Sequence, residues 1–131
     1  MTRFLSLVAV VVPDYDEAIE FYVNRLGFRL VEDSVQTPEK RWVVVAPSGA
    51  AETHLLLAKA ANPQQVQSIG NQTGGRVFLF LKSDQFDADY AAFRAAGIKF
   101  LEAPRQEPYG RVVVFQDPFG NKWDLLENVA P

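Results

Sequence analysis

The chain has 131 residues, a length typical of one domain or of two small halves that share a core. It contains no cysteine, which excludes disulfides, thiolate nucleophiles and zinc–thiolate sites. Its 13 basic and 16 acidic side chains give a net charge of −3 and are interspersed, so we expect no nucleic-acid partner.

The apolar run at residues 4–12 predicts a strand covered on both faces. Pro13 and Asp14 follow it, where a signal peptide would carry small cleavage-site residues. No run approaches the roughly 18 apolar residues of a membrane span. We therefore expect a cytoplasmic protein without a membrane partner.

A helix is predicted to begin at Asp14, whose carboxylate can cap the first turn together with Glu17. Apolar residues follow at helical spacing, and Gly27 is placed to end the helix. Three strands are predicted next, at residues 28–35, 41–46 and 52–58. The first half is therefore expected to be a βαβββ module.

The second half shows the same order of elements after a polar stretch at 59–73, which predicts a linker or loop. A strand is predicted at 76–82, followed by a helix that Ser83 or Asp84 caps and Gly97 ends. A short strand is predicted at 98–101, and residues 102–110 are expected to form a loop. The closing stretch, 112–127, reads as strand, Asp-Pro-Phe-Gly turn and strand.

The two halves repeat with an offset of 70 or 71 residues. Gly27 matches Gly97 at 70, and Gly49 matches Gly120 at 71. Three apolar positions of the first helix match three of the second at 71, namely Tyr15, Ile19 and Tyr22 with Phe86, Tyr90 and Phe93. The pattern indicates an internal duplication.

With Val12-Pro13-Asp14, the Leu26-Gly27-Phe28 helix exit and Asp117-Pro118-Phe119-Gly120-Asn121, the chain resembles the vicinal oxygen chelate superfamily of glyoxalases, bleomycin-resistance proteins and dioxygenases. The resemblance implies an α+β fold in which tandem βαβββ modules form curved mixed sheets around a cleft. It implies one domain over 1–131, with modules at about 3–58 and 74–128 joined by 59–73. It also implies a homodimer as the expected assembly and a small-molecule ligand as the partner.

Metal-dependent members of that family carry ligands on the first and fourth strands of each module. By the predicted register those positions are Leu7, His54, Arg76 and Asp124. Leu7 offers no lone pair, and Arg76 stays protonated and would repel a divalent cation. We therefore expect no metal cofactor. A lactoylglutathione-lyase-like lyase, an isomerase or a dioxygenase using a divalent metal at His54 and Asp124 stays open as the alternative.

The expected ligand-binding residues share a cleft that is apolar and aromatic with a few polar groups, as small-molecule sites are. Three alternatives stay open: His54 as a structural residue, an Arg76–Asp124 ion pair that joins the modules, and a non-catalytic dimeric module whose cleft is packed shut. Whether any reaction is catalysed also stays open. The expected ligand-binding residues are His54, Arg76, Phe78, Phe80 and Asp124, with Arg105 and Tyr109 from the overhanging loop.

Overall fold

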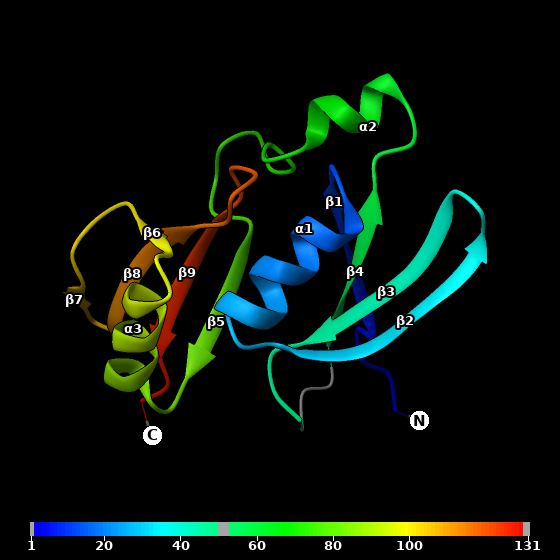
Figure 1. Cartoon of the computed structure of the whole chain (residues 1–131). Coiled ribbons are helices and arrows are strands. Elements are labelled where there is room, and N and C mark those ends of the chain that lie inside the picture. Colours follow the sequence, from blue (N-terminus) through cyan, green and yellow to red (C-terminus); the bar gives the residue numbers. More distant parts are fainter. Residues whose placement is uncertain (1, 50–52, 130–131) are drawn as a thin grey trace. The chain divides into compact units, whose positions relative to one another are not determined.

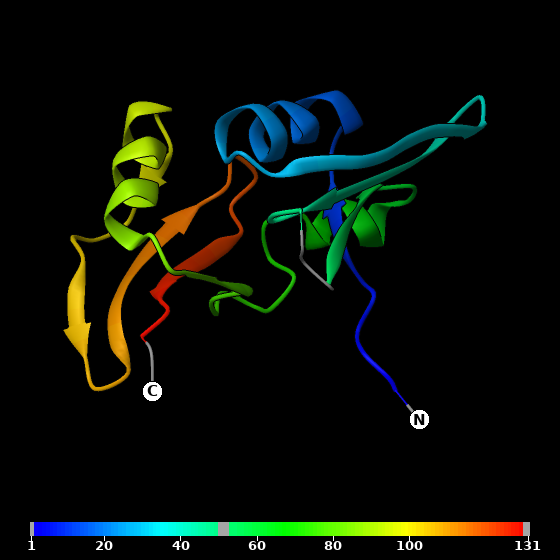
Figure 2. The same ribbon diagram turned by 90° about the horizontal axis from the view of Figure 1, so that it is seen from below.

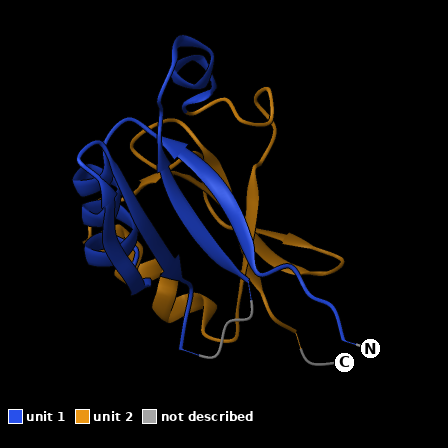
Figure 3. Cartoon of the chain, turned by 90° about the vertical axis from the view of Figure 1, so that its right-hand side faces the viewer, with its two compact units in different colours: residues 1–69 blue, residues 70–131 orange. Residues whose placement is uncertain are grey.

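The structure of the protein is a computed structural model that describes residues 2–49 and 53–129. The chain divides into two compact units, residues 1–69 and 70–131 (Figure 3). Each unit holds one mixed sheet, so the expected α+β fold is confirmed (Figure 1). Within the described ranges, no helix is both long enough and apolar enough to cross a membrane.

Unit 1 is built around a four-stranded sheet, sheet A, in the order β1-β4-β3-β2. Its edge strand β1 pairs with β4 in parallel, and the other neighbours are antiparallel. A short helix, α2, follows the sheet in the chain. The elements are β1 (Leu7–Val12), α1 (Tyr15–Ile19), the π-helix η1 (Glu20–Arg25), β2 (Arg29–Thr37), β3 (Lys40–Ala46), β4 (His54–Lys59) and α2 (Pro63–Ser68).

Unit 2 repeats this arrangement in sheet B, in the order β5-β9-β8-β6, with β7 pairing to β8 as well. Its edge strand β5 again pairs in parallel with the last strand, β9. Both units therefore follow the order of a βαβββ module, and unit 2 adds the short strand β7 to it. The elements are β5 (Leu79–Ser83), α3 (Phe86–Ala95), β6 (Lys99–Phe100), β7 (Arg105–Glu107), β8 (Gly110–Gln116) and β9 (Lys122–Glu127).

The ends of the first helix are as predicted. Oδ2 of Asp14 accepts a hydrogen bond from the backbone N–H of Glu17 at 2.9 Å. Gly27 adopts φ +84° just past the helical segment. The prediction for the second helix is wrong in detail, because its N-cap is Gln85, and Ser83 instead accepts from the Gln85 N–H at 2.9 Å.

Several strand and loop predictions are corrected. Phe4 and Leu5 lie outside β1 and are 61% and 73% exposed. β1 itself is covered on one face rather than on both, since Val10 and Val12 are buried and Leu7 and Ala9 are exposed. The polar linker contains helix α2, which Asn62 caps by accepting from the Gln65 N–H at 2.9 Å. The predicted loop at 102–110 contains strand β7, and the strand predicted at 76–82 begins only at Leu79. The start of the strand predicted at 52–58 falls on Glu52, outside the described residues.

In each unit one arginine of the sheet contacts two residues of the helix. In unit 1, Arg41 of β3 donates to Asp16 at 2.9 Å and lies over the Tyr15 ring at 5.1 Å. It also donates two bonds to Asp33 of β2, at 2.7 and 3.1 Å. This guanidinium holds the pKa of the Asp33 carboxyl below its usual range. An arginine bonded to an acidic residue and stacked on an aromatic ring fixes both position and orientation.

Unit 2 repeats the same contact 70 or 71 residues later. Arg111 of β8 donates to Asp87 at 2.7 and 3.2 Å and lies over the Phe86 ring at 4.7 Å. Its third partner is Glu127 of β9, at 3.0 Å. The duplication therefore extends from the order of elements to a specific side-chain contact.

In each unit the helix lies against one face of the sheet (Figure 2). In unit 2 the Phe115 ring lies 5.5 Å from that of Phe93 in α3 and stacks on Trp123 at 5.8 Å. In unit 1 the helix-side residues of β3 and β4, Val43, Val45 and Leu57, are fully buried. The core of each unit therefore lies between helix and sheet, and the opposite faces are left for other contacts.

The hairpin turn of unit 2 is fixed by Asp117, whose Oδ1 accepts from the N–H groups of Phe119 and Asn121 at 3.0 and 2.8 Å. Gly70 packs directly on this turn. A Cβ added to Gly70 would lie 1.9 Å from the backbone oxygen of Phe119, and φ at Gly70 is +70°. Only glycine fits there.

We therefore expect Gly70→Ala to lower the free energy of unfolding by roughly 2–5 kcal/mol, because it adds a backbone clash to the cost of positive φ. Gly27→Ala is the matched control, since Gly27 also has positive φ but no atom lies within 4 Å of its added Cβ. Urea unfolding of both variants measures the difference. Equal losses in the two variants would contradict the close approach.

Candidate functional site

Three of the seven predicted ligand-binding residues, Phe80, Tyr109 and Asp124, come together on the face of sheet B opposite α3. In β9, Trp123 and Leu125 point to the helix side, so Asp124 points to the opposite face. Asp124 is the cross-strand neighbour of Phe80 in β5 and of Val114 in β8. Phe80 is 63% exposed.

A shallow cavity of about 340 Å³ lies on this face. Two exposed aromatic side chains, Phe80 and Tyr109, line it together with the carboxyl of Asp124. We call it the Asp124 cavity. It is completed by Lys82, Leu126 and Glu127.

The carboxyl group of Asp124 brings to this cavity a buried oxygen atom that lacks a hydrogen bond. The residue is only 7% exposed, and its Oδ1 has no hydrogen-bond partner among the residues that the structure describes. Burial raises the pKa of this carboxyl, Glu102 raises it further, and Arg105 opposes both. A buried carboxyl oxygen without a partner is costly unless a ligand or water satisfies it.

Arg105 stands close enough to influence Asp124 but is already engaged. It donates to both carboxylate oxygens of Glu102, at 3.1 and 3.2 Å, and forms an ion pair with Glu107. It lies in strand β7 rather than in the predicted loop. Its charge is therefore partly neutralised before any ligand arrives.

The Arg76–Asp124 ion pair, one of the alternatives that the sequence left open, does not form. Arg76 precedes β5 and is exposed, and no ion pair of the described residues includes it. Phe78 is half-buried just before β5, where its N–H donates to the Lys122 carbonyl at 2.8 Å. Neither residue lines the Asp124 cavity.

His54 belongs to unit 1 and begins β4. It is the cross-strand neighbour of Leu7, and its N–H donates to the carbonyl of Ser6 at 2.9 Å. Strand alternation places it on one face of sheet A with Leu56 and Ala58, as predicted. The side chain is half-buried.

The strand pairing in the structure corrects the register from which the family's metal-ligand positions were predicted. Val114 pairs with Asp124, and Val44, 70 residues earlier, pairs with Leu56. The position in unit 1 that matches Asp124 is therefore Leu56 rather than His54. The residue 71 positions after Leu7 is Phe78, whose N–H donates a hydrogen bond to the carbonyl of Lys122 in β9. Phe78 rather than Arg76 is therefore the position in unit 2 that matches Leu7.

The corrected positions, Leu7, Leu56, Phe78 and Asp124, include one side chain that can bind a metal. A catalytic metal usually needs at least three protein ligands. Across residues 2–49 and 53–129, no group of three His, Cys, Asp or Glu side chains is arranged to hold an ion. The donor set does not fit the metal centre of the metal-dependent family members.

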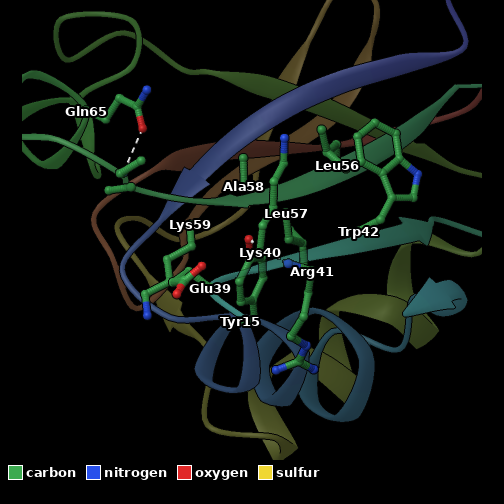
Figure 4. A pocket seen from close by; sticks show the side chains of 12 residues that line it. Tyr15, Glu39, Lys40, Arg41, Trp42, Leu56, Leu57, Ala58, Lys59 and Gln65 are labelled. Carbon is green, nitrogen blue, oxygen red and sulfur yellow. Dashed lines mark hydrogen bonds between the residues drawn. The ribbon is translucent and has the colours of Figure 1, made fainter. Parts of the chain in front are cut away.

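Sequence reasoning missed Lys82, which shares the face of Phe80 by strand alternation and could have been found from that period. It also missed a larger cavity of about 520 Å³ in unit 1, beside Trp42 (Figure 4). The other tryptophan, Trp123, packs inside unit 2, where it is 3% exposed and stacked on Phe115.

Comparisons with known proteins agree on one family. The family model described as Glyoxalase/Bleomycin resistance protein/Dioxygenase superfamily matches residues 5–125. A protein of Shewanella frigidimarina (strain NCIMB 400), described as "Uncharacterized protein", is 55% identical over 97% of this chain and 95% of its own.

Two solved structures show the same fold. UcmS2 has a TM-score of 0.82 at 30% identity, covering 96% of this chain and 98% of its own. TnmS3, described as an antibiotic binding protein from Streptomyces sp. CB03234, has a TM-score of 0.78 at 32% identity, covering 98% of each chain.

The raised pKa of Asp124 predicts a pH dependence of stability. The folded chain keeps this proton to higher pH than the unfolded chain, whose Asp pKa is about 3.9, so stability is lost as pH rises above that value. We expect the free energy of unfolding of the wild type, relative to Asp124→Asn, to fall as the pH rises above about 4. Urea unfolding across this range measures it. The control is exposed Asp84→Asn, which removes the same charge, and identical pH profiles for the two variants would refute the assignment.

Proposed function

The chain belongs to the Glyoxalase/Bleomycin resistance protein/Dioxygenase superfamily, and on that premise we propose that it binds a small organic molecule without a catalytic metal. The binding site is the Asp124 cavity. Sequestration or recognition of the ligand, rather than its chemical conversion, is the activity. The homodimeric assembly and the cytoplasmic location stay predictions.

The observation that carries this proposal is the unpartnered Oδ1 of Asp124 beside exposed aromatic rings. Exposed aromatic side chains around a buried polar group are the composition of ligand sites, in which apolar walls supply affinity and a few polar groups fix orientation. Phe80 and Tyr109 would contact the flat part of the ligand. Asp124 would orient it.

The chemistry of Asp124 narrows the ligand class. As a carboxylate, its Oδ1 accepts a hydrogen bond from a ligand hydroxyl or amine; as a carboxylic acid, it can donate one to a carbonyl. Arg105 is paired with Glu102 and Glu107, so it offers little attraction to an anion. The cavity suits a neutral or cationic aromatic molecule that carries a polar group.

The likeness to TnmS3 supports a small-molecule ligand, since that protein is described as antibiotic binding. The metal-dependent alternative lacks such support, because Asp124 stands alone among the four corrected ligand positions. We therefore expect the ligand to bind equally well after a chelator has removed any metal ions.

We expect isothermal titration to find saturable binding of a neutral or cationic aromatic member of a panel that includes bleomycin and other aromatic antibiotics. Aromatic acids and glutathione conjugates, which are anions at neutral pH, should bind more weakly. Phe80→Ala and Asp124→Asn should each weaken the neutral or cationic ligand about tenfold or more, through lost ring contact and lost orientation. Exposed Lys99→Ala is the control and should bind like the wild type.

The affinity should also be unchanged after dialysis against EDTA. The proposal fails if no member of the panel binds, if both variants bind normally, or if EDTA abolishes binding.

A further inference from the structure

The Asp124 cavity contains a free cation, Lys82 of β5. The Lys82 side chain lines the cavity and is exposed. Its ammonium group forms neither an ion pair nor a hydrogen bond with any residue that the structure describes. The cavity therefore offers a ligand a free positive charge as well as the unpartnered carboxyl oxygen of Asp124.

Lys82 and Asp124 lie on the same face of sheet B. In the parallel ladder of β5 and β9, Phe80 pairs with Asp124 and Lys82 pairs with Leu126. Because side chains alternate along a strand, Phe80 and Lys82 share one face of β5, and Asp124 and Leu126 share that same face of β9. All four line the cavity. They form the corners of a rectangle, with the two charged groups on one diagonal and the two apolar groups on the other.

The strand geometry separates the two charged residues. Neighbouring strands lie about 4.8 Å apart and a strand rises about 3.3 Å per residue, so the Cα atoms of Lys82 and Asp124 are about 8 Å apart. No ion pair of the described residues joins their side chains. A ligand with an ammonium and a carboxylate on one carbon, and a hydrogen bond of about 2.8 Å at each end, spans a similar distance.

The neighbouring charged groups are already bonded within unit 2. Both carboxylate oxygens of Glu127 accept hydrogen bonds from Arg111, at 3.1 and 3.0 Å. Arg105 is held by two ion pairs of its own. Of the charged side chains in the described lining of the cavity, Lys82 and Asp124 are therefore the two that a ligand can engage.

Resting on the function proposed for the Asp124 cavity, we infer that its ligand is a zwitterionic aromatic molecule of the amino-acid type. The ligand ammonium donates to Oδ1 of Asp124, and the ligand carboxylate accepts from the Lys82 ammonium. The ligand ring lies on the apolar diagonal, against the exposed ring of Phe80 and the half-buried side chain of Leu126. Lys82 thus determines the preference for a zwitterion over a simple cation.

Three compounds with one carbon skeleton test this inference by isothermal titration into the full chain. L-Phenylalanine carries both charged groups, 2-phenylethylamine lacks the carboxylate, and 3-phenylpropanoate lacks the ammonium. We expect L-phenylalanine to bind with a Kd below about 1 mM. Each of the other two should bind at least tenfold more weakly, because each loses one charge-assisted hydrogen bond.

Variants of the two charged residues assign each bond. Lys82→Met should weaken L-phenylalanine at least tenfold but should not weaken 2-phenylethylamine, which has no carboxylate for Lys82 to bind. Asp124→Asn should weaken both compounds. Lys99→Met is the matched control, because Lys99 is exposed on sheet B but does not line the cavity, and it should bind all three compounds like the wild type. Thermal unfolding checks that each variant is folded.

The inference is overturned if L-phenylalanine does not bind, if 2-phenylethylamine binds as tightly, or if Lys82→Met keeps the wild-type affinity for L-phenylalanine. The proposed function survives each of these results as long as Phe80→Ala and Asp124→Asn still weaken the aromatic ligand of the titrated panel. If those two variants bind that ligand normally, the proposed function itself fails.

Discussion

An arginine on one strand of each module holds the helix to one face of the sheet, and the free faces follow from this contact. Arg41 joins Asp16 and the Tyr15 ring in unit 1, and Arg111 joins Asp87 and the Phe86 ring in unit 2. An exposed ion pair alone contributes little stability, but a guanidinium that also stacks on a ring and bonds a second acidic residue fixes a geometry. With the helix held on one side, the alternate side chains of every strand face away from it. The candidate sites lie among those side chains.

The two modules use the same frame differently. Unit 2 keeps β8 and β9 paired and places one buried carboxyl, Asp124, on an aromatic face. Unit 1 has the apolar Leu56 at the matching position and instead opens β3 from β4, with the Tyr15 hydroxyl satisfying the released amide. One duplicated framework thus carries two cavities with different linings: one surrounds a buried carboxyl group in unit 2, and the other lies beside Trp42 in unit 1.

Local signals predicted the fold well and the site only in part. The Asp14 cap, Gly27 and the Asp117 turn act through neighbouring residues, so the sequence alone places them. The repeat of 70 or 71 residues gave the module order. Strand alternation and the closing hairpin also predicted where Phe80 and Asp124 lie, and the resemblance to the family placed Tyr109 in the loop above them. Their role in ligand binding stays a prediction. Arg76 was misplaced because its strand begins three residues later than predicted, and a ladder register depends on contacts between distant segments. The Tyr15–Arg41 bond spans 26 residues, so no local pattern could reveal the opening in sheet A.

The central claim is that the face of sheet B around Asp124 binds an aromatic ligand through its unpartnered carboxyl oxygen. A crystal structure of the full chain in complex with the tightest ligand of the titrated panel tests this most directly. The account predicts a ring against Phe80 and a ligand donor or acceptor within hydrogen-bond distance of Oδ1 of Asp124, about 2.5–3.2 Å. A ligand bound elsewhere, with Oδ1 of Asp124 still unpartnered, would contradict it.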